Sequence, residues 1–130
     1  MKSKYSKELA VAKLAARKEG KFLLQRFGKE SKRYAKGKYD FALKTDRDAE
    51  KIIIRIIKSH FPSHAILAEE SGESGDSEYK WLIDPLDGTH NYASGVPVFG
   101  TSVALQHNSE VVVGAIYLPL SNELYYAERG

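Results

Sequence analysis

The chain has 130 residues, of which 42% are hydrophobic and 28% are charged. This length and composition suit a single globular domain with a core of its own. The absence of cysteine excludes disulfides and thiolate metal sites, and it is consistent with a cytoplasmic protein. No apolar stretch approaches the roughly 18 residues that a membrane span needs, so we expect no membrane contact.

Charge is divided unequally along the chain. Residues 1–65 contain 18 Lys and Arg against 7 Asp and Glu, whereas residues 66–130 contain 2 against 10. A basic half raises the question of nucleic-acid binding. Its lysines, however, alternate with apolar positions at helical intervals, which is typical of a solvated helix face. We therefore do not expect a nucleic-acid partner.

Two helices are predicted in the first half. Apolar and small residues recur every three or four positions from Leu9 to Phe27, and Gly28 is a plausible end of this helix. A polar loop over 29–38 and a short strand over 39–43 follow. Thr45 and Asp46 then resemble the N-cap and first turn of a second helix. Its buried face is supplied by Ala49, Ile52, Ile53, Ile56 and Ile57.

The second half predicts strands. Residues 65–68 form a short apolar strand, 71–78 a polar loop, and 81–83 another strand. An antiparallel meander is expected from three further runs, 99–105, 111–117 and 124–127. Helices followed by mainly antiparallel strands predict an α+β fold. Because no helix follows the last strand to cover the sheet, we expect an exposed sheet face or edge, covered by another chain or left open in a shortened one.

Carboxylates follow two of the predicted strands. Glu69 and Glu70 come directly after 65–68, and Asp84 and Asp87 come after 81–83. If the two strands are neighbours, these four charges meet in a small volume and raise one another's pKa unless a cation neutralises them. Oxygen ligands in a chain without cysteine favour Mg²⁺.

Gly88 and Thr89 have the features of a phosphate site. Glycine lets the backbone approach a ligand closely, and free N–H groups at the start of a helix bind phosphate oxygens. Metal ligands beside such a site predict metal-assisted hydrolysis of a phosphate ester. Two alternatives exist: Asp84 and Asp87 could merely build a turn, or the chain could be a haloacid-dehalogenase-type phosphatase. That second class uses Asp-x-Asp-Gly-Thr, one residue shorter than the spacing here.

The segment from Trp81 to Tyr92, WLIDPLDGTHNY, resembles the signature of the inositol monophosphatase family, and Pro97 follows as in that family. Glu69-Glu70-Ser71 resembles the family's Glu-Glu-Ser element, and Asp40 and Asp46 resemble an upstream pair of aspartates. The resemblance covers nearly the whole chain. It implies that residues 1–130 are the N-terminal metal- and phosphate-binding domain of a layered αβαβα fold, with the C-terminal domain absent.

The resemblance also implies a set of metal ligands. Glu69, Asp84 and the carbonyl of Leu86 would hold a first Mg²⁺, and Asp84 and Asp87 would share a second. Glu69 would in addition reach a third, weaker ion, which makes two or three ions in all. Glu70 would act on the ions indirectly or through a water.

Catalytic and phosphate-binding roles are implied in the same way. Asp46 and Thr89, with Glu69, would orient or deprotonate the water that attacks phosphorus. Asp87, Gly88 and Thr89 would contact the phosphate. No covalent phospho-enzyme is implied, which distinguishes this mechanism from that of the haloacid dehalogenases.

Family members are longer than this chain, and a second signature, Trp-Asp-x-Ala, gives them a further metal-binding aspartate. The resemblance therefore implies weak Mg²⁺ binding and slow turnover for the 130 residues. It also implies a homodimer and a small phosphorylated substrate. Inositol monophosphate is the first expectation and fructose 1,6-bisphosphate the second, with a nucleotide 3′-phosphate or histidinol phosphate also open. A different class of function stays open as well: a non-catalytic basic module that binds nucleic acid or a protein partner.

Overall fold

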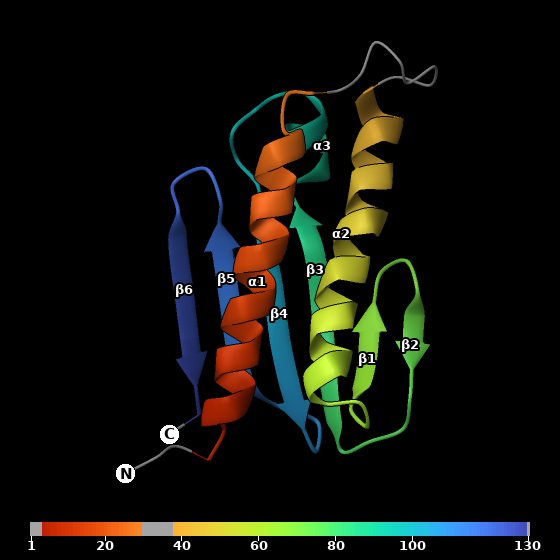
Figure 1. Ribbon diagram of the computed structural model, residues 1–130, viewed down its shortest axis with the longest axis vertical. Coiled ribbons are helices and arrows are strands. Elements are labelled where there is room, and N and C mark those ends of the chain that lie inside the picture. Colours follow the sequence, from red (N-terminus) through yellow and green to blue (C-terminus); the bar gives the residue numbers. More distant parts are fainter. Residues whose placement is uncertain (1–3, 30–37, 130) are drawn as a thin grey trace.

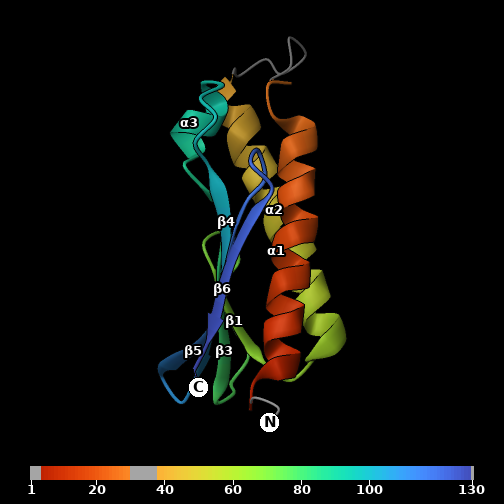
Figure 2. The same cartoon turned by 90° about the vertical axis from the view of Figure 1, so that its left-hand side faces the viewer.

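The computed structural model describes residues 4–29 and 38–129. Helices α1 (Ser6–Arg26) and α2 (Lys38–His60) lie side by side on one face of a six-stranded sheet, as Figures 1 and 2 show. The strands are β1 (Ala65–Ala68), β2 (Gly72–Ser74), β3 (Tyr79–Asp87), β4 (Gly100–His107), β5 (Glu110–Leu118) and β6 (Glu123–Glu128), and the short helix α3 (Thr89–Ala93) follows β3. The predicted α+β class is confirmed.

The sheet has the strand order β2-β1-β3-β4-β5-β6. Only β1 and β3 run parallel; the other neighbouring pairs are antiparallel. Ala68, the last residue of β1, pairs with Ile83 of β3. The two strands that precede the predicted carboxylates are therefore neighbours and point the same way, and the predicted meander is confirmed in β4, β5 and β6.

The core lies between the helices and the sheet. Every second residue of the central strands faces the helices and is buried, as the alternation of a strand requires: Trp81, Ile83, Val103, Leu105, Val113, Ala115 and Tyr117. The small residues of α1 allow close packing against the sheet. A Cβ atom added to Gly20 would lie 2.2 Å from Cδ2 of Tyr117, so α1 can sit this near to β5 only because residue 20 is glycine.

Two local predictions are wrong. The strand over 39–43 and the N-cap at Thr45 do not form, because α2 is continuous from Lys38. Its buried positions recur at helical spacing from Ala42 onward, so packing against the rest of the protein overrides the strand preference of Tyr39 and Phe41. The predicted loop 29–38 and the side chain of Asp40 fall mainly or wholly outside the part that the structure describes.

The predicted loop 71–78 also contains a short strand. β2 pairs antiparallel with β1 at the edge of the sheet, where three residues are too few to give an alternating pattern. The sheet face opposite α1 and α2 is open, as expected: Leu67, Ile116 and Tyr125 are 42%, 49% and 55% exposed. Among the described residues, no helix is long and apolar enough to cross a membrane.

Candidate active site

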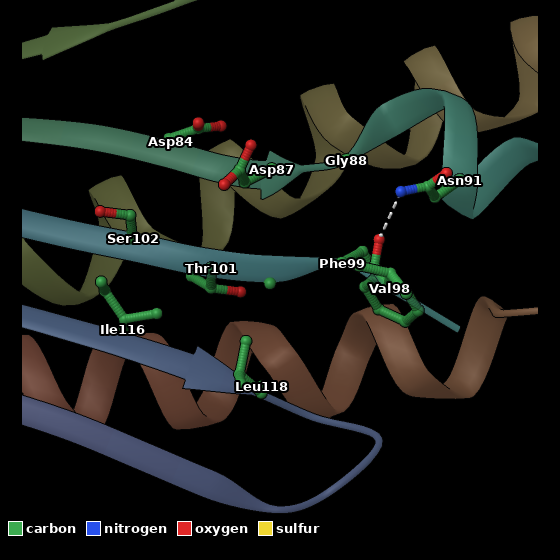
Figure 3. A pocket seen from close by; sticks show the side chains of 11 residues that line it. Asp84, Asp87, Gly88, Asn91, Val98, Phe99, Thr101, Ser102, Ile116 and Leu118 are labelled. Carbon is green, nitrogen blue, oxygen red and sulfur yellow. Dashed lines mark hydrogen bonds between the residues drawn. The ribbon is translucent and has the colours of Figure 1, made fainter. Parts of the chain in front are cut away.

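An irregularity at the end of β3 positions Asp84 and Asp87. Asp84 pairs with Ser102 of β4, and Asp87 pairs with Gly100, so β3 advances one residue more than its partner between these pairs. Such a bulge bends the strand and re-aims its side chains. Pro85 and Leu86 within the bulge are buried, while Asp87 is exposed. Figure 3 shows both carboxylates at this end of the strand.

Gly88 turns the chain from β3 into α3. Its φ of 94° belongs to the left-handed region, and an added Cβ would lie 2.7 Å from the carbonyl oxygen of Val98. Asn91 Nδ2 donates to the same carbonyl at 3.0 Å, which ties α3 to the segment before β4 (Figure 3). A pocket of about 400 Å³ lies beside this turn and includes Asp84, Asp87 and Gly88 in its lining.

Glu50 holds the chain at the end of β1, and the sequence analysis missed it. This carboxylate is 3% exposed and extends from α2. Its Oε1 accepts from the Glu70 N–H at 2.9 Å, and its Oε2 accepts from the N–H and hydroxyl of Ser71 at 3.1 and 2.9 Å. The available signal was position, because Glu50 lies one helical turn after Asp46 on the same face of α2. Glu50 thus fixes the turn that carries Glu69 and Glu70.

Asp46 faces these carboxylates from α2 and is 2% exposed. Burial is the largest of the causes that raise its pKa to about 7, and four neighbouring carboxylates add to it: Glu69, Asp84, Glu70 and Glu50. Its Oδ1 is buried and has no hydrogen-bond partner among the described residues. Asp46 was predicted at a helix start; the structure places it inside α2 and still directs it to the predicted site.

Asp84 lies between Asp87 and Glu69 and interacts electrostatically with both. Burial raises its pKa, and the negative charges of Asp87 and Glu69 raise it further, while a hydrogen bond from the Leu86 backbone opposes them. Asp84 and Asp87 border the pocket described above, and Asp84 and Glu69 border a second one of about 720 Å³ on the open sheet face. The five predicted carboxylates therefore form one electrostatically connected group, in which Asp46 is coupled to Glu69, Glu70 and Asp84, and Asp84 to Asp87.

Within the described residues, no three His, Asp or Glu side chains lie close enough together to hold one metal ion. The donors nevertheless fit a hard divalent cation in kind. They are all oxygens, the neighbouring carboxylates help to raise the pKa of Asp46 and of Asp84, and one buried oxygen of Asp46 lacks a partner among the described residues. The structure thus brings the predicted ligands into one region without drawing them around one point.

Thr89 lies where α3 begins, and its hydroxyl contacts the end of β3. Oγ1 donates to the carbonyl oxygen of Leu86 at 3.2 Å. The resemblance had paired Thr89 with Asp46 and had assigned the Leu86 carbonyl to a metal. The hydroxyl expected to orient the water and the carbonyl expected to bind a metal ion are therefore hydrogen-bonded to each other.

Comparisons with known proteins give one consistent result. The sequence profile of the Inositol monophosphatase family matches residues 4–130. A "Fructose-1,6-bisphosphatase/inositol-1-monophosphatase" from Aquifex aeolicus is 45% identical over 127 residues, 95% of this chain and 48% of that protein. A "Nus factor SuhB" from Vibrio cholerae is 42% identical over 94% of this chain and 47% of its own length.

Solved structures agree with the sequence matches. An inositol monophosphatase from Anabaena superimposes with a TM-score of 0.84 at 38% identity, covering 98% of this chain and 46% of that one. The chain therefore spans about half the length of the relatives that it matches.

Proposed function

The chain belongs to the inositol monophosphatase family, and from this premise we propose that it contributes the metal- and phosphate-binding part of a Mg²⁺-dependent phosphatase acting on small phosphate monoesters. The observation that carries the proposal is the gathering of carboxylates from α2, β1 and β3 beside the Gly88 turn, with the pKa of Asp46 and of Asp84 raised. A surface that only contacts a partner has no need of mutually repelling, partly buried carboxylates.

Glu69, Asp84, Asp87 and the Leu86 carbonyl would hold the ions. Bound Mg²⁺ would neutralise phosphate charge, lower the pKa of a water and stabilise the leaving oxygen. The protein's part is to aim these oxygens. Glu50 fixes the turn that follows β1 through three hydrogen bonds, and the bulge of β3 separates Asp84 from Asp87.

Asp46 is the candidate for moving the proton of the attacking water. A carboxyl whose pKa is raised to about 7 is a stronger base than an ordinary aspartate and exchanges its proton near neutral pH. Its free Oδ1 leaves an acceptor available for a water. Thr89 would orient that water only after turning its hydroxyl from the Leu86 carbonyl, so we assign the first role to Asp46.

Gly88 and Thr89 would receive the phosphate. The backbone at Gly88 is free of a side chain, which lets an anion approach the amides at the turn. The substrate class follows from the relatives, whose names include inositol-1-monophosphatase and fructose-1,6-bisphosphatase. Inositol monophosphate and fructose 1,6-bisphosphate are therefore the two substrates to test first.

The test is phosphate release from both compounds by the 130-residue chain, measured as Mg²⁺ is raised. We expect Mg²⁺-dependent release that Asp84→Asn lowers by about 100-fold, because a ligand to the ions is lost. Asp76→Asn is the matched control, since it removes the same charge from an exposed position between β2 and β3. The proposal would be contradicted if phosphate release did not depend on Mg²⁺, or if Asp84→Asn and Asp76→Asn lowered it equally.

A second candidate function has one observation in its favour. Lysines and arginines cover the solvent-facing sides of α1 and α2, where the exposed ones are Lys7, Arg17, Lys18, Lys21, Lys44, Arg47, Lys51 and Arg55. Such a face could bind nucleic acid or an acidic protein. Single-stranded RNA binding that weakens steeply with salt and is lost in the double variant Lys18→Glu/Lys21→Glu, while phosphate release is absent, would favour this function over the first.

A further inference from the structure

Glu19 is an ionisable residue on the buried, otherwise apolar face of α1. Its side chain is 0% exposed and lies along the helix between the buried residues Ala16 and Leu23. Oε2 accepts a short hydrogen bond from the hydroxyl of Thr101, and Oε1 has no partner among the described residues. An ionised carboxylate so buried would cost several kcal/mol, so its presence here requires a reason other than packing.

Thr101 connects Glu19 to the bulge of β3. It lies on β4, is 1% exposed, and sits between the residues that pair with Asp84 and Asp87. Its Oγ1 is 3.5 Å from the carbonyl oxygen of Pro85, which is inside the bulge. A polar bridge therefore runs from α1 through Thr101 to the backbone between the two aspartates. None of the three groups is part of the predicted site.

We propose that Glu19 and Thr101 are positioning residues: their bridge holds the bulge of β3 from behind, and with it the directions of Asp84 and Asp87. The inference rests on the proposed function, because positioning matters only if these aspartates bind a ligand. Carboxylates that repel one another tend to move apart, so a bulge carrying two of them needs support from the core side.

The chemistry of the bridge supports this role. Burial raises the pKa of Glu19 well above its usual value against the lowering effect of the Thr101 hydrogen bond, and the charges of Asp46 and Asp84 raise it further. A raised pKa favours the neutral acid, which has an O–H to donate. In that form the hydrogen bond described above reverses: the Glu19 O–H donates to Thr101 Oγ1, and the single Thr101 proton turns to the Pro85 carbonyl. An ionised Glu19 would take that proton and leave Pro85 without it.

Hydrogen exchange tests the bridge itself. Thr101→Val keeps the shape of the side chain and removes the hydroxyl. We expect the backbone amides of residues 86–89 to exchange about tenfold faster in this variant. Thr101→Ser, which restores a hydroxyl, and Glu19→Gln, which keeps a neutral donor and acceptor, should stay close to the native protein. Val103→Ala is the control, because it removes buried volume two residues along the same face of β4 without touching the bridge.

Calorimetric Mg²⁺ titration tests what the bridge does for the site. We expect Thr101→Val to weaken Mg²⁺ binding by about tenfold, and Val103→Ala to leave it unchanged while lowering the melting temperature. Equal exchange at 86–89 in Thr101→Val and Val103→Ala would overturn the inference. So would faster exchange with unaltered Mg²⁺ affinity, because the bridge would then serve stability alone. If the native chain binds no Mg²⁺, the proposed function fails, and exchange by itself decides whether the bridge holds the bulge.

Discussion

The two ends of the molecule differ in whether their buried polar groups have hydrogen-bond partners. At the end where α2 stops and β3 begins, which is the lower end in Figure 1, four rings form what we call the ring stack: Phe61 and His64 from the loop between α2 and β1, Tyr79 from β3 and His107 from β4. Within it, His64 lies 4.6 Å from Phe61 and 4.7 Å from Tyr79 between ring centroids, nearly parallel to both. Nε1 of the buried Trp81 donates to His64 Nδ1 at 3.0 Å. Polar groups here have both stacking and hydrogen-bond partners.

The other end, where β3 meets α3, we call the carboxylate end. Among the described residues, the buried side-chain oxygens and nitrogens without a partner are Glu19 Oε1, Thr45 Oγ1 and Asp46 Oδ1, and all three belong to this end. Native proteins leave few such groups, so their concentration in one place indicates a function. The comparison suggests that the ring stack contributes stability, and that the carboxylate end gives up stability for a ligand.

The largest effect should come from removing the middle of the ring stack. His64→Ala takes away a ring that is 8% exposed, leaves a cavity and leaves the Trp81 N–H without its acceptor. We expect the free energy of unfolding to fall by about 3 kcal/mol in a urea titration. His60→Ala, at an exposed position near the end of α2, is the control and should change it by less than about 0.5 kcal/mol. Similar losses in the two variants would break the comparison.

The next largest loss of stability should come from Glu50, a buried polar residue at the carboxylate end whose oxygens do have hydrogen-bond partners. Glu50→Gln keeps the size of the side chain but turns an NH₂ group toward the donors of Glu70 or Ser71. We expect a loss of about 2 kcal/mol, because hydrogen bonds to a charged acceptor are replaced by a clash of donors. Glu50→Gln should also weaken Mg²⁺ binding in a calorimetric titration, since the turn that carries Glu69 loosens. A Mg²⁺ affinity equal to that of the native chain would show that Glu50 is only structural.

At the carboxylate end, the features that depend on a local run of apolar residues could be predicted from the sequence. The apolar runs predict strands that lead into Glu69 and Asp84, although β3 itself continues past Asp84 to Asp87, where it still pairs with β4. The parallel pairing of β1 with β3 brings the two sets of carboxylates to the same edge. Glu50 and Glu19 could not be found this way. Each lies on a helix face where the pattern calls for an apolar residue, and only the packing of α2 on the end of β1, or of α1 on β4, reveals its partner. A charged residue at a buried helical position was the signal available.

The start of α2 was mispredicted for a related reason. Tyr39 and Phe41 favour a strand by propensity, and Thr45-Asp46 has the composition of an N-cap. The structure instead continues the helix, because Ala42, Thr45 and Ala49 extend the buried face of Ile53 and Ile57 by about three turns. Reading 45–46 as a cap placed Asp46 at the start of a helix, whereas it lies inside α2, where burial is the largest cause of its raised pKa.

A third prediction uses pH to sharpen the comparison. The pKa of Asp46 is about 7 in the folded protein and lower when unfolded, so its protonated form favours folding at low pH, and that contribution is lost as the pH rises through 7. In buffer without metal, we expect the native chain to be less stable at about pH 8 than at about pH 5, by about 2 to 3 kcal/mol from this group. Asp46→Asn should lack this part of the dependence.

The pH dependence of stability should be compared between the native chain and Asp46→Asn, because His64 also contributes to it. Burial lowers its pKa, so its contribution is lost as the pH falls and opposes that of Asp46 over part of the range. Thermal melts of the native chain and of Asp46→Asn, taken across the same pH series, cancel the His64 contribution in their difference. A difference that stays flat between about pH 5 and about pH 8 would show that Asp46 does not titrate there.

The smallest effect is expected at the rim of the ring stack. His107 stacks on Tyr79 at 4.1 Å and shares a hydrogen bond of 2.8 Å with the hydroxyl of Tyr5, while its Nε2 is 3.4 Å from Glu78. The Glu78 side chain is 57% exposed, so water screens this contact. Glu78→Gln should therefore change the free energy of unfolding by less than about 0.5 kcal/mol in urea, whereas Tyr5→Phe, which removes the partner of His107 Nδ1, should cost about 1 kcal/mol. If Glu78→Gln proved the more damaging of the two, charge rather than stacking and buried hydrogen bonds would stabilise this end, and the contrast with the carboxylate end would fail.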